Sequence, residues 1–349
     1  MPDGSGAACP EHGPPEESHH RFCEVCGRNL MTPASAAPGS GATPPGAPVP
    51  VAPVPGVARW LSSRASSDTC GGCGTTQTAS GTHCEHCGRR RSPGGDRAER
   101  DLGRLAGVTD RARRRRNEDA FAIGTLAGST IGVVCDGVST SARADTAAHA
   151  AVDAAMAAIL TALADGAGPE AATAAGARLA AESVRAEGST TDGEFPPSCT
   201  YVSAIVTAAA ITIGWIGDSR AYWLGSAPPD ASRLTIDDSV VGRLTAGLPV
   251  PDGAAAEPNS RALIRWLGAD SDDSAAQIVF RRPTGPGRLV LCSDGLSHYL
   301  SEPAALAAAL AGAGPEPLAQ ARHLTRVALD SGGHDNVAVV VMPFPPSDV

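Results

Sequence analysis

Lysine is absent from this chain of 349 residues, because all 28 of its basic residues are arginine. P-loop nucleotide hydrolases, protein kinases and Schiff-base enzymes each need an active-site lysine, so these classes are disfavoured. Long apolar runs are also missing, since none approaches the roughly 20 residues that span a membrane, and the N-terminus is polar. We therefore expect no signal peptide, no membrane anchor and a cytoplasmic location.

An excess of positive charge is lacking as well. The formal net charge is −9 at pH 7, whereas a nucleic-acid-binding body is expected to be basic. Nucleic acid is therefore not an expected partner. Apolar residues make up 42% of the chain, which is typical of globular proteins, and the length suffices for one large domain with appendages.

Cysteine is concentrated in the N-terminal part, where seven of the ten cysteines lie before residue 90. Six of these seven form C-x-x-C pairs, which in a chain without a secretion signal favour metal thiolates over disulfides. Two pairs separated by ten residues predict a structural Zn²⁺ site made by Cys70, Cys73, Cys84 and Cys87. The same spacing near the N-terminus predicts a second zinc site made by Cys9, His12, Cys23 and Cys26. His19 or His20 is an alternative to His12 as the fourth ligand.

These two segments, residues 1–31 and 68–92, resemble zinc ribbons. Residues 32–67 between them are rich in Pro and Ala and are predicted to form an extended linker. A polar linker, residues 93–100, follows the second module. Modules on such linkers suit the docking of protein partners, and the sequence leaves open whether they instead dimerise or are inert.

Residues 101–345 have the pattern of one packed domain of strands and helices. Four short apolar runs predict buried strands: Ile131–Cys135, Tyr201–Val206, Leu289–Cys292 and Val337–Met342. Four segments with apolar residues at helical spacing predict helices: residues 145–163, 169–186, 302–311 and 317–329.

Acidic residues stand where the apolar runs start or stop: Asp136, Asp218, Asp294 and Asp335, with Glu118-Asp119 as a fifth acidic point. Converging carboxylates repel one another and cannot all stay ionised without cations between them. Because the donors are oxygens, the matching metals are Mg²⁺ or Mn²⁺. Two such ions can share a water, lower its pKa and fix it for in-line attack on phosphorus.

An arginine run, residues 113–116, lies directly before the acidic pair and supplies candidates for binding a phosphate group. The alternative interpretation is a solvated patch or a patch that contacts nucleic acid. Its position before N-E-D favours the phosphate role.

The order of motifs is R-x-x-N-E-D, V-C-D-G, G-D-S-R-A-Y, L-T-x-D, C-S-D-G-L and H-D-N-V. Over residues 101–345 this order resembles the metal-dependent Ser/Thr protein phosphatases of the PP2C (PPM) family, bacterial type. The resemblance implies an α+β fold: a four-layer α-β-β-α sandwich of two antiparallel sheets, with metals at one end. The two zinc-ribbon-like modules would precede this domain.

The resemblance also implies roles for the metal ligands. Asp136 would bridge two Mn²⁺ or Mg²⁺ ions, and the Gly137 carbonyl would bind one of them. Glu118 would complete that site, while Asp294 and Asp335 would hold the other metal.

Further roles come from the same resemblance. Asp119 would orient metal-bound water, and Asp218 would serve a weaker third metal. Arg114 matches the phosphate-binding arginine, with Arg113 as the alternative because the segment before Glu118 is one residue short. The chain departs from the family at Asp237–Ser239, where the family often has D-H-S, and this change is expected to alter the substrate-side loop.

The resulting hypothesis is a cytoplasmic phosphatase that hydrolyses phosphoserine and phosphothreonine by attack of a water bridging two metal ions. Its partners would be phosphorylated proteins, including a Ser/Thr kinase or the substrates of that kinase. The alternative is a catalytically weak or inactive signalling adaptor that docks partners through its zinc ribbons. The complete set of acidic residues favours the enzyme.

Overall fold

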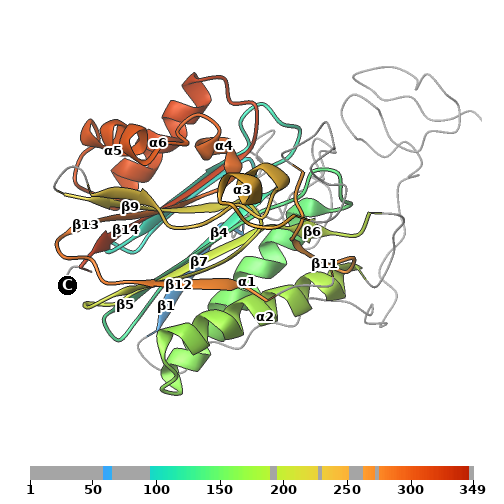
Figure 1. Ribbon diagram of the computed structural model, residues 1–349, viewed down its shortest axis with the longest axis horizontal. Helices are drawn as coiled ribbons and strands as arrows, with labels where there is room; N and C mark the ends of the chain where they lie inside the picture. The colour runs from blue at the N-terminus through green and yellow to red at the C-terminus, as the bar shows by residue number, and fades with distance from the viewer. Residues whose placement is uncertain are drawn as a thin grey trace, which may run out of the picture.

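The computed structural model describes residues 58–64, 95–188, 195–226, 230–250, 262–271 and 275–345. Its centre is a pair of six-stranded sheets whose neighbouring strands are all antiparallel (Figure 1). The first sheet contains, in spatial order, β1 (Arg59–Ser62), β4 (Asp119–Leu126), β5 (Ser129–Asp136), β7 (Tyr201–Val206), β8 (Ile211–Ile216) and β12 (Gln277–Arg281). The second contains β10 (Ala231–Arg233), β9 (Arg220–Gly225), β13 (Gly287–Cys292), β14 (Val337–Phe344), β3 (Ala106–Asp110) and β2 (Arg97–Asp101).

Helices cover the outer face of each sheet. The first sheet is covered by α1 (Ala144–Ala164) and α2 (Pro169–Gly188), and the second by α5 (Pro303–Ala311) and α6 (Pro317–Asp330) (Figure 1). Two shorter helices, α3 (Val240–Thr245) and α4 (Asp294–Ser297), and a small pair of strands, β6 (Ser198–Cys199) with β11 (Leu267–Gly268), complete the described elements. The predicted four-layer α-β-β-α sandwich is therefore confirmed for this part of the chain.

Strands buried on both faces explain why the apolar runs were continuous rather than alternating. Every residue of β7, β8 and β14 is buried. One apolar cluster fills the space between the two sheets, with Phe121, Trp223 and Val340 among its members. The sheets are thus held face to face, and their strand ends are fixed in position.

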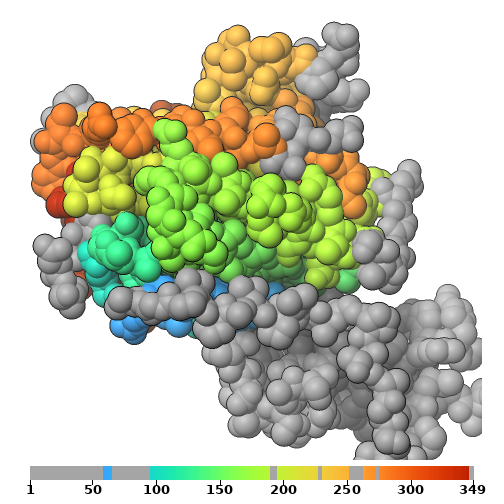
Figure 2. Space-filling view, turned by 90° about the horizontal axis from the view of Figure 1, so that it is seen from below, coloured from blue at the N-terminus to red at the C-terminus, as the bar shows by residue number. Residues whose placement is uncertain are grey.

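Among the described elements, α1 alone is long and apolar enough to cross a membrane by composition, although no apolar run of that length was expected. Alanines account for the difference, and several of them, such as Ala147 and Ala151, are buried against the first sheet and α2. In Figure 2 the outer helical layer (green) lies between β12 (orange) and β1 (blue). The helix packs as a core helix of the sandwich.

The linker predictions were wrong at two places. Residues Arg59–Ser62, inside the predicted linker 32–67, pair with β4, and Arg97–Arg100, inside the predicted linker 93–100, pair with β3. Ser63 extends the first pairing, because its backbone N–H donates to the Phe121 carbonyl at 2.8 Å and its hydroxyl accepts from the Phe121 N–H at 3.0 Å. Arg59–Ser62 and Arg97–Arg100 therefore belong to the domain as strands.

Candidate metal centre and active site

The strand ends bring the predicted acidic residues to one end of the sandwich. Asp119 begins β4 and pairs across the first sheet with Asp136, which ends β5. Asp218 follows β8, Asp294 opens α4 directly after β13, and Asp335 lies just before β14. Carboxylates placed opposite one another on neighbouring strands are destabilising unless something neutralises them.

The pKa values of these carboxylates are raised by burial and by the charges of the neighbouring carboxylates. Burial raises the pKa of Asp136 well above its usual range, and the carboxylates of Asp119 and Asp294 raise it further. Burial is also the main cause of the raised pKa values of Asp119 and Asp294. At Asp218, burial followed by the charge of Asp294 raises the pKa to about 7. A bound cation is what would let the group ionise together.

One carboxylate oxygen of Asp119 accepts a hydrogen bond from the protein, and the other does not. The Ser293 hydroxyl donates to its Oδ2 at 2.6 Å, and the same hydroxyl accepts from the Ala338 N–H at 2.9 Å. Oδ1 is buried and has no hydrogen-bond partner among the described residues. A buried carboxylate oxygen without a partner is costly unless a ligand satisfies it.

Gly137 is required by its close packing. A Cβ at this position would lie 2.8 Å from the backbone of Ala144, the first residue of α1, so only glycine fits without a shift. Its N–H donates to the Glu118 carbonyl at 3.1 Å, which joins the two predicted ligands. The donor set of carboxylates and a carbonyl fits Mn²⁺ or Mg²⁺. In the described part of the chain, no three His, Cys, Asp or Glu side chains are gathered closely enough to hold a metal ion.

Arg114 is the arginine that lies beside the carboxylates. Its Nε is 3.4 Å from Asp335 Oδ1, and its Nη2 is 3.9 Å from Glu118 Oε2. The same Nη2 donates to the Ser139 hydroxyl. Arg113 instead contacts Gly333 through its backbone, and its side chain is exposed. The geometry thus places Arg114 rather than Arg113 next to the predicted metal ligands.

Asn336, the third residue of the H-D-N-V motif, fixes the loop that carries the arginines, a role that the motif alone does not reveal. The side chain is buried, and its Oδ1 accepts from the Glu118 N–H at 2.9 Å. Its Nδ2 donates to the carbonyls of Arg111 and Arg116, at 2.8 Å each. One amide therefore holds both ends of the loop that carries Arg114.

Asp238 lies where the family pattern often has histidine, and it connects Gly217, next to Asp218, to the segment around Ile264 and Arg265. Its Oδ2 accepts from the Gly217 N–H at 3.1 Å and from Arg265 Nη1 at 3.0 Å. Its Oδ1 accepts from Gln277 Nε2 at 3.0 Å. The Asp238 carbonyl also accepts from the Ile264 N–H at 2.8 Å. The departure from the pattern has therefore created a buried ionic connection.

Asp238→Ala is expected to lower the free energy of unfolding by about 2–4 kcal/mol, because the Gly217 N–H, Arg265 and Gln277 lose their hydrogen-bond acceptor and two guanidinium groups lose a nearby carboxylate. Arg265 Nη1 lies 3.0 Å and Arg243 Nη1 lies 3.7 Å from this carboxylate. Urea denaturation measures the change. The matched control is Glu182→Gln, which breaks an exposed pair with Arg178 on α2 and should cost under about 0.5 kcal/mol. Equal losses in the two variants would contradict the expectation.

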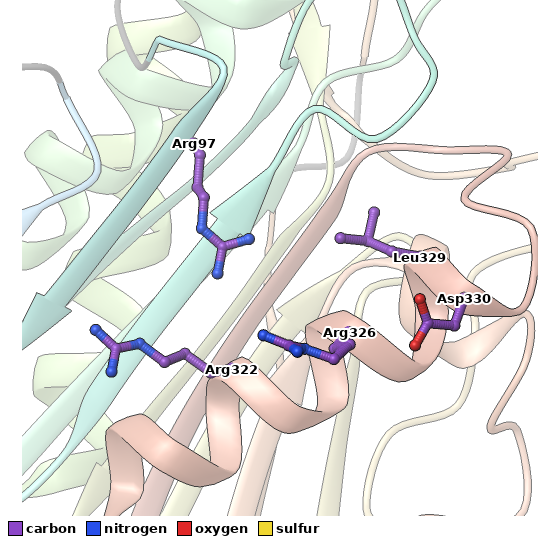
Figure 3. A pocket seen from close by; sticks show the side chains of 5 residues that line it. All are labelled: Arg97, Arg322, Arg326, Leu329 and Asp330. Atoms are coloured by element: carbon purple, nitrogen blue, oxygen red, sulfur yellow. The ribbon is translucent and has the colours of Figure 1, made fainter.

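A separate pocket of about 350 Å³ lies between β2 and α6, lined by Arg97, Arg322, Arg326, Leu329 and Asp330 (Figure 3). Glu99 accepts from Arg97 Nη2 at 2.7 Å and from Arg322 Nε at 2.8 Å, and Asp110 accepts from Arg97 Nη1 at 2.6 Å. The negative charges of Glu99, Asp110 and Asp330 equal in number the positive charges of Arg97, Arg322 and Arg326. The network attaches α6 to β2 and so helps to fix the segment that leads to Asp335.

Three cysteines of the described domain, Cys135, Cys199 and Cys292, are buried and form no disulfide. The eight predicted zinc ligands and the alternatives His19 and His20 all lie outside the described residues.

The fold and the position of the site point to one class of protein. Residues 106–239 match the family model described as Protein phosphatase 2C. A crystal structure of a bacterial serine phosphatase superposes with a TM-score of 0.58 at 22% identity, covering 70% of this chain and 99% of that chain. The domain therefore has the protein phosphatase 2C fold.

One named protein, PstP, is similar to this chain both in sequence and in structure. The serine/threonine protein phosphatase PstP of Mycobacterium tuberculosis is 35% identical over 127 residues, which are 36% of this chain and 23% of PstP. The alignment thus spans less than a quarter of that relative's length. The crystal structure of the catalytic domain of PstP in complex with two manganese ions has a TM-score of 0.54 at 26% identity, covering 71% of this chain and 99% of that chain.

Proposed function

We propose that this chain is a metal-dependent phosphatase that hydrolyses phosphoserine and phosphothreonine in proteins. The observation that carries the proposal is the cluster of partly to fully buried carboxylates at one end of the two sheets, with the Arg114 guanidinium beside it. The fold and the match to protein phosphatase 2C over residues 106–239 support it.

Five groups would hold two Mn²⁺ or Mg²⁺ ions: the carboxylates of Glu118, Asp136, Asp294 and Asp335, and the Gly137 carbonyl. Asp218 would serve a third ion. When bound, the ions would supply a water of lowered pKa as the nucleophile. The choice of Mn²⁺ is supported by the manganese ions of the PstP catalytic domain.

Two further residues would act on the reactants directly. Arg114 would bind the phosphate oxygens with its planar fork of N–H donors, which suits a phosphate better than a lysine would. Asp119 would accept a hydrogen bond from the nucleophilic water through Oδ1, since Ser293 already occupies Oδ2. Both groups are held by hydrogen bonds from other elements, and such support preorganises a site.

The substrates would be phosphorylated proteins, including a Ser/Thr kinase or the proteins that it phosphorylates. This assignment is supported by the relatives, which are described as serine/threonine phosphatases. The test is Mn²⁺-dependent release of phosphate from an aryl phosphate and from a phosphothreonine peptide, with and without a chelator. Activity that is absent with Mn²⁺, or that survives in Asp136→Asn, would overturn the proposal and favour the adaptor hypothesis.

We also propose that residues 1–31 and 68–92 bind structural zinc and dock protein partners. The second of these segments lies between β1 and β2, and both strands belong to the domain. Arg100 Nε donates to the Ser62 carbonyl at 2.8 Å, and Arg100 Nη2 donates to the Arg64 carbonyl at 3.1 Å. The segment proposed as the second module is therefore flanked in sequence by two strands of the domain.

Zinc content should be close to two ions per chain in the purified full-length protein, measured by mass spectrometry of the metals. Cys84→Ser should lower the content to about one ion, because a thiolate of one four-ligand site is lost. Asp136→Asn should keep both ions, which makes it the matched control for a change in the other metal centre. A parent chain without zinc would refute the assignment.

A further inference from the structure

Ser139 lies three residues after Asp136, in the turn between β5 and α1, and belongs to none of the sequence motifs named above. Its hydroxyl accepts a hydrogen bond from Arg114 Nη2 and lies beside the Glu118 carboxylate. The two partners are the proposed phosphate-binding group and a proposed metal ligand. Ser139 is therefore the contact that joins them.

A hydroxyl at this position suits the chemistry of its two neighbours. A guanidinium can only donate hydrogen bonds and an ionised carboxylate can only accept them, whereas a hydroxyl does both. Ser139 can accept from Arg114 and donate to Glu118 at the same time. Alanine or glycine would leave the guanidinium to the direct attraction of Glu118 and Asp335, whose oxygens lie 3.9 and 3.4 Å away.

The turn itself is fixed, so the Ser139 side chain is presented in a defined place. The Val138 N–H donates to the Ser198 carbonyl at 3.0 Å, and the Ser141 N–H donates to the Val138 carbonyl at 2.8 Å. The Ser141 hydroxyl in turn accepts from the Ser198 N–H at 3.2 Å. These bonds anchor Val138 and Ser141, which lie on either side of Ser139, to Ser198 in β6.

We propose that Ser139 is a positioning residue that orients Arg114 toward the substrate phosphate and keeps it from pairing with the metal ligand Glu118. The inference rests on the proposed phosphatase function. It assigns Ser139 no contact with the reacting atoms, so its effect should appear in phosphate binding and should depend on Arg114.

The test uses the full-length, Mn²⁺-loaded protein and compares Ser139→Ala with the parent. Affinity for inorganic phosphate, measured by titration calorimetry, should fall about tenfold, because a hydrogen bond to a charged group is lost. The KM for an aryl phosphate should rise in proportion. Ser139→Thr retains the hydroxyl and should stay within about threefold of the parent.

Two controls separate this role from a general effect on the turn. Thr140→Ala removes the neighbouring exposed hydroxyl and should leave phosphate affinity unchanged. In an Arg114→Met background, Ser139→Ala should have no further effect on phosphate affinity, because the group that it orients is gone.

The outcomes distinguish the two proposals. A parent that hydrolyses the ester, with unchanged phosphate affinity in Ser139→Ala, would overturn the role of Ser139 alone. An equal loss in the Arg114→Met background would overturn it as well. A parent that neither binds phosphate nor hydrolyses the ester would overturn the phosphatase function and this inference with it.

Discussion

Asp136→Asn should lower Mn²⁺-dependent hydrolysis of an aryl phosphate by about 10³-fold or more. Asp136 ends β5 opposite Asp119, and its pKa is raised by burial and by Asp119, Asp294, Asp218 and Asp335. Four acidic side chains therefore act on Asp136, which supports the bridging role proposed for it. An amide is neutral and supplies one acceptor oxygen together with an N–H₂ group that would repel a cation.

The loss of activity in Asp136→Asn should not come from misfolding. Stability measurements on the metal-free protein, prepared with a chelator, can show this. In the folded chain a raised pKa means that ionised Asp136 opposes folding at pH 7, where the unfolded chain ionises freely. Asn removes that unfavourable charge, so the variant should unfold at an equal or higher urea concentration than the parent. Lower stability would contradict the electrostatic account.

A matched carboxylate far from the site provides the control for activity. Asp230 pairs with Arg281 at 2.7 Å, near the end of β9 that lies away from Asp218. Asp230→Asn should keep full activity with Mn²⁺. Comparable losses in Asp136→Asn and Asp230→Asn would mean that activity does not depend on the carboxylate cluster.

The buried strands and their acidic ends could be predicted because each carries its signal locally. The run before Asp136 is apolar throughout, since β5 is covered by α1 on one face and by the second sheet on the other. The Asp-Gly pair then marks the point where burial stops. The same pattern at Leu289–Cys292 locates Asp294, although that residue opens the short helix α4 rather than a simple turn.

The parts that could not be predicted depend on partners far along the chain. β2 reads R-A-E-R-D, which has no apolar alternation, and it forms a strand because it pairs with β3 and exchanges ion pairs with α6. β1 is only four residues long and pairs with β4, more than 50 residues away. The roles of Ser139 and Asp238 likewise come from contacts that spacing alone does not reveal.

Gly295→Ala should lower the free energy of unfolding by about 3 kcal/mol or more, the second large effect expected in this domain. A Cβ at Gly295 would lie 1.8 Å from the carbonyl oxygen of Asn336 and 2.9 Å from its carbonyl carbon. Both atoms belong to the backbone, so no side-chain rotation can relieve the overlap. The helix α4 and the start of β14 would have to move apart.

That movement would also separate two proposed metal ligands, because Gly295 follows Asp294 and Asn336 follows Asp335 in the chain. Misplacement by about 1 Å can cost on the order of 10²-fold in rate, so the fraction that still folds should be strongly impaired. Urea denaturation and Mn²⁺-dependent hydrolysis measure the two losses.

Gly312→Ala is the matched control, because Gly312 has φ −85° and its added Cβ would meet nothing closer than 3.9 Å. It should change stability by less than about 1 kcal/mol and leave activity intact. If Gly295→Ala behaves like this control, the close contact between α4 and β14 is not what holds Asp294 and Asp335 together.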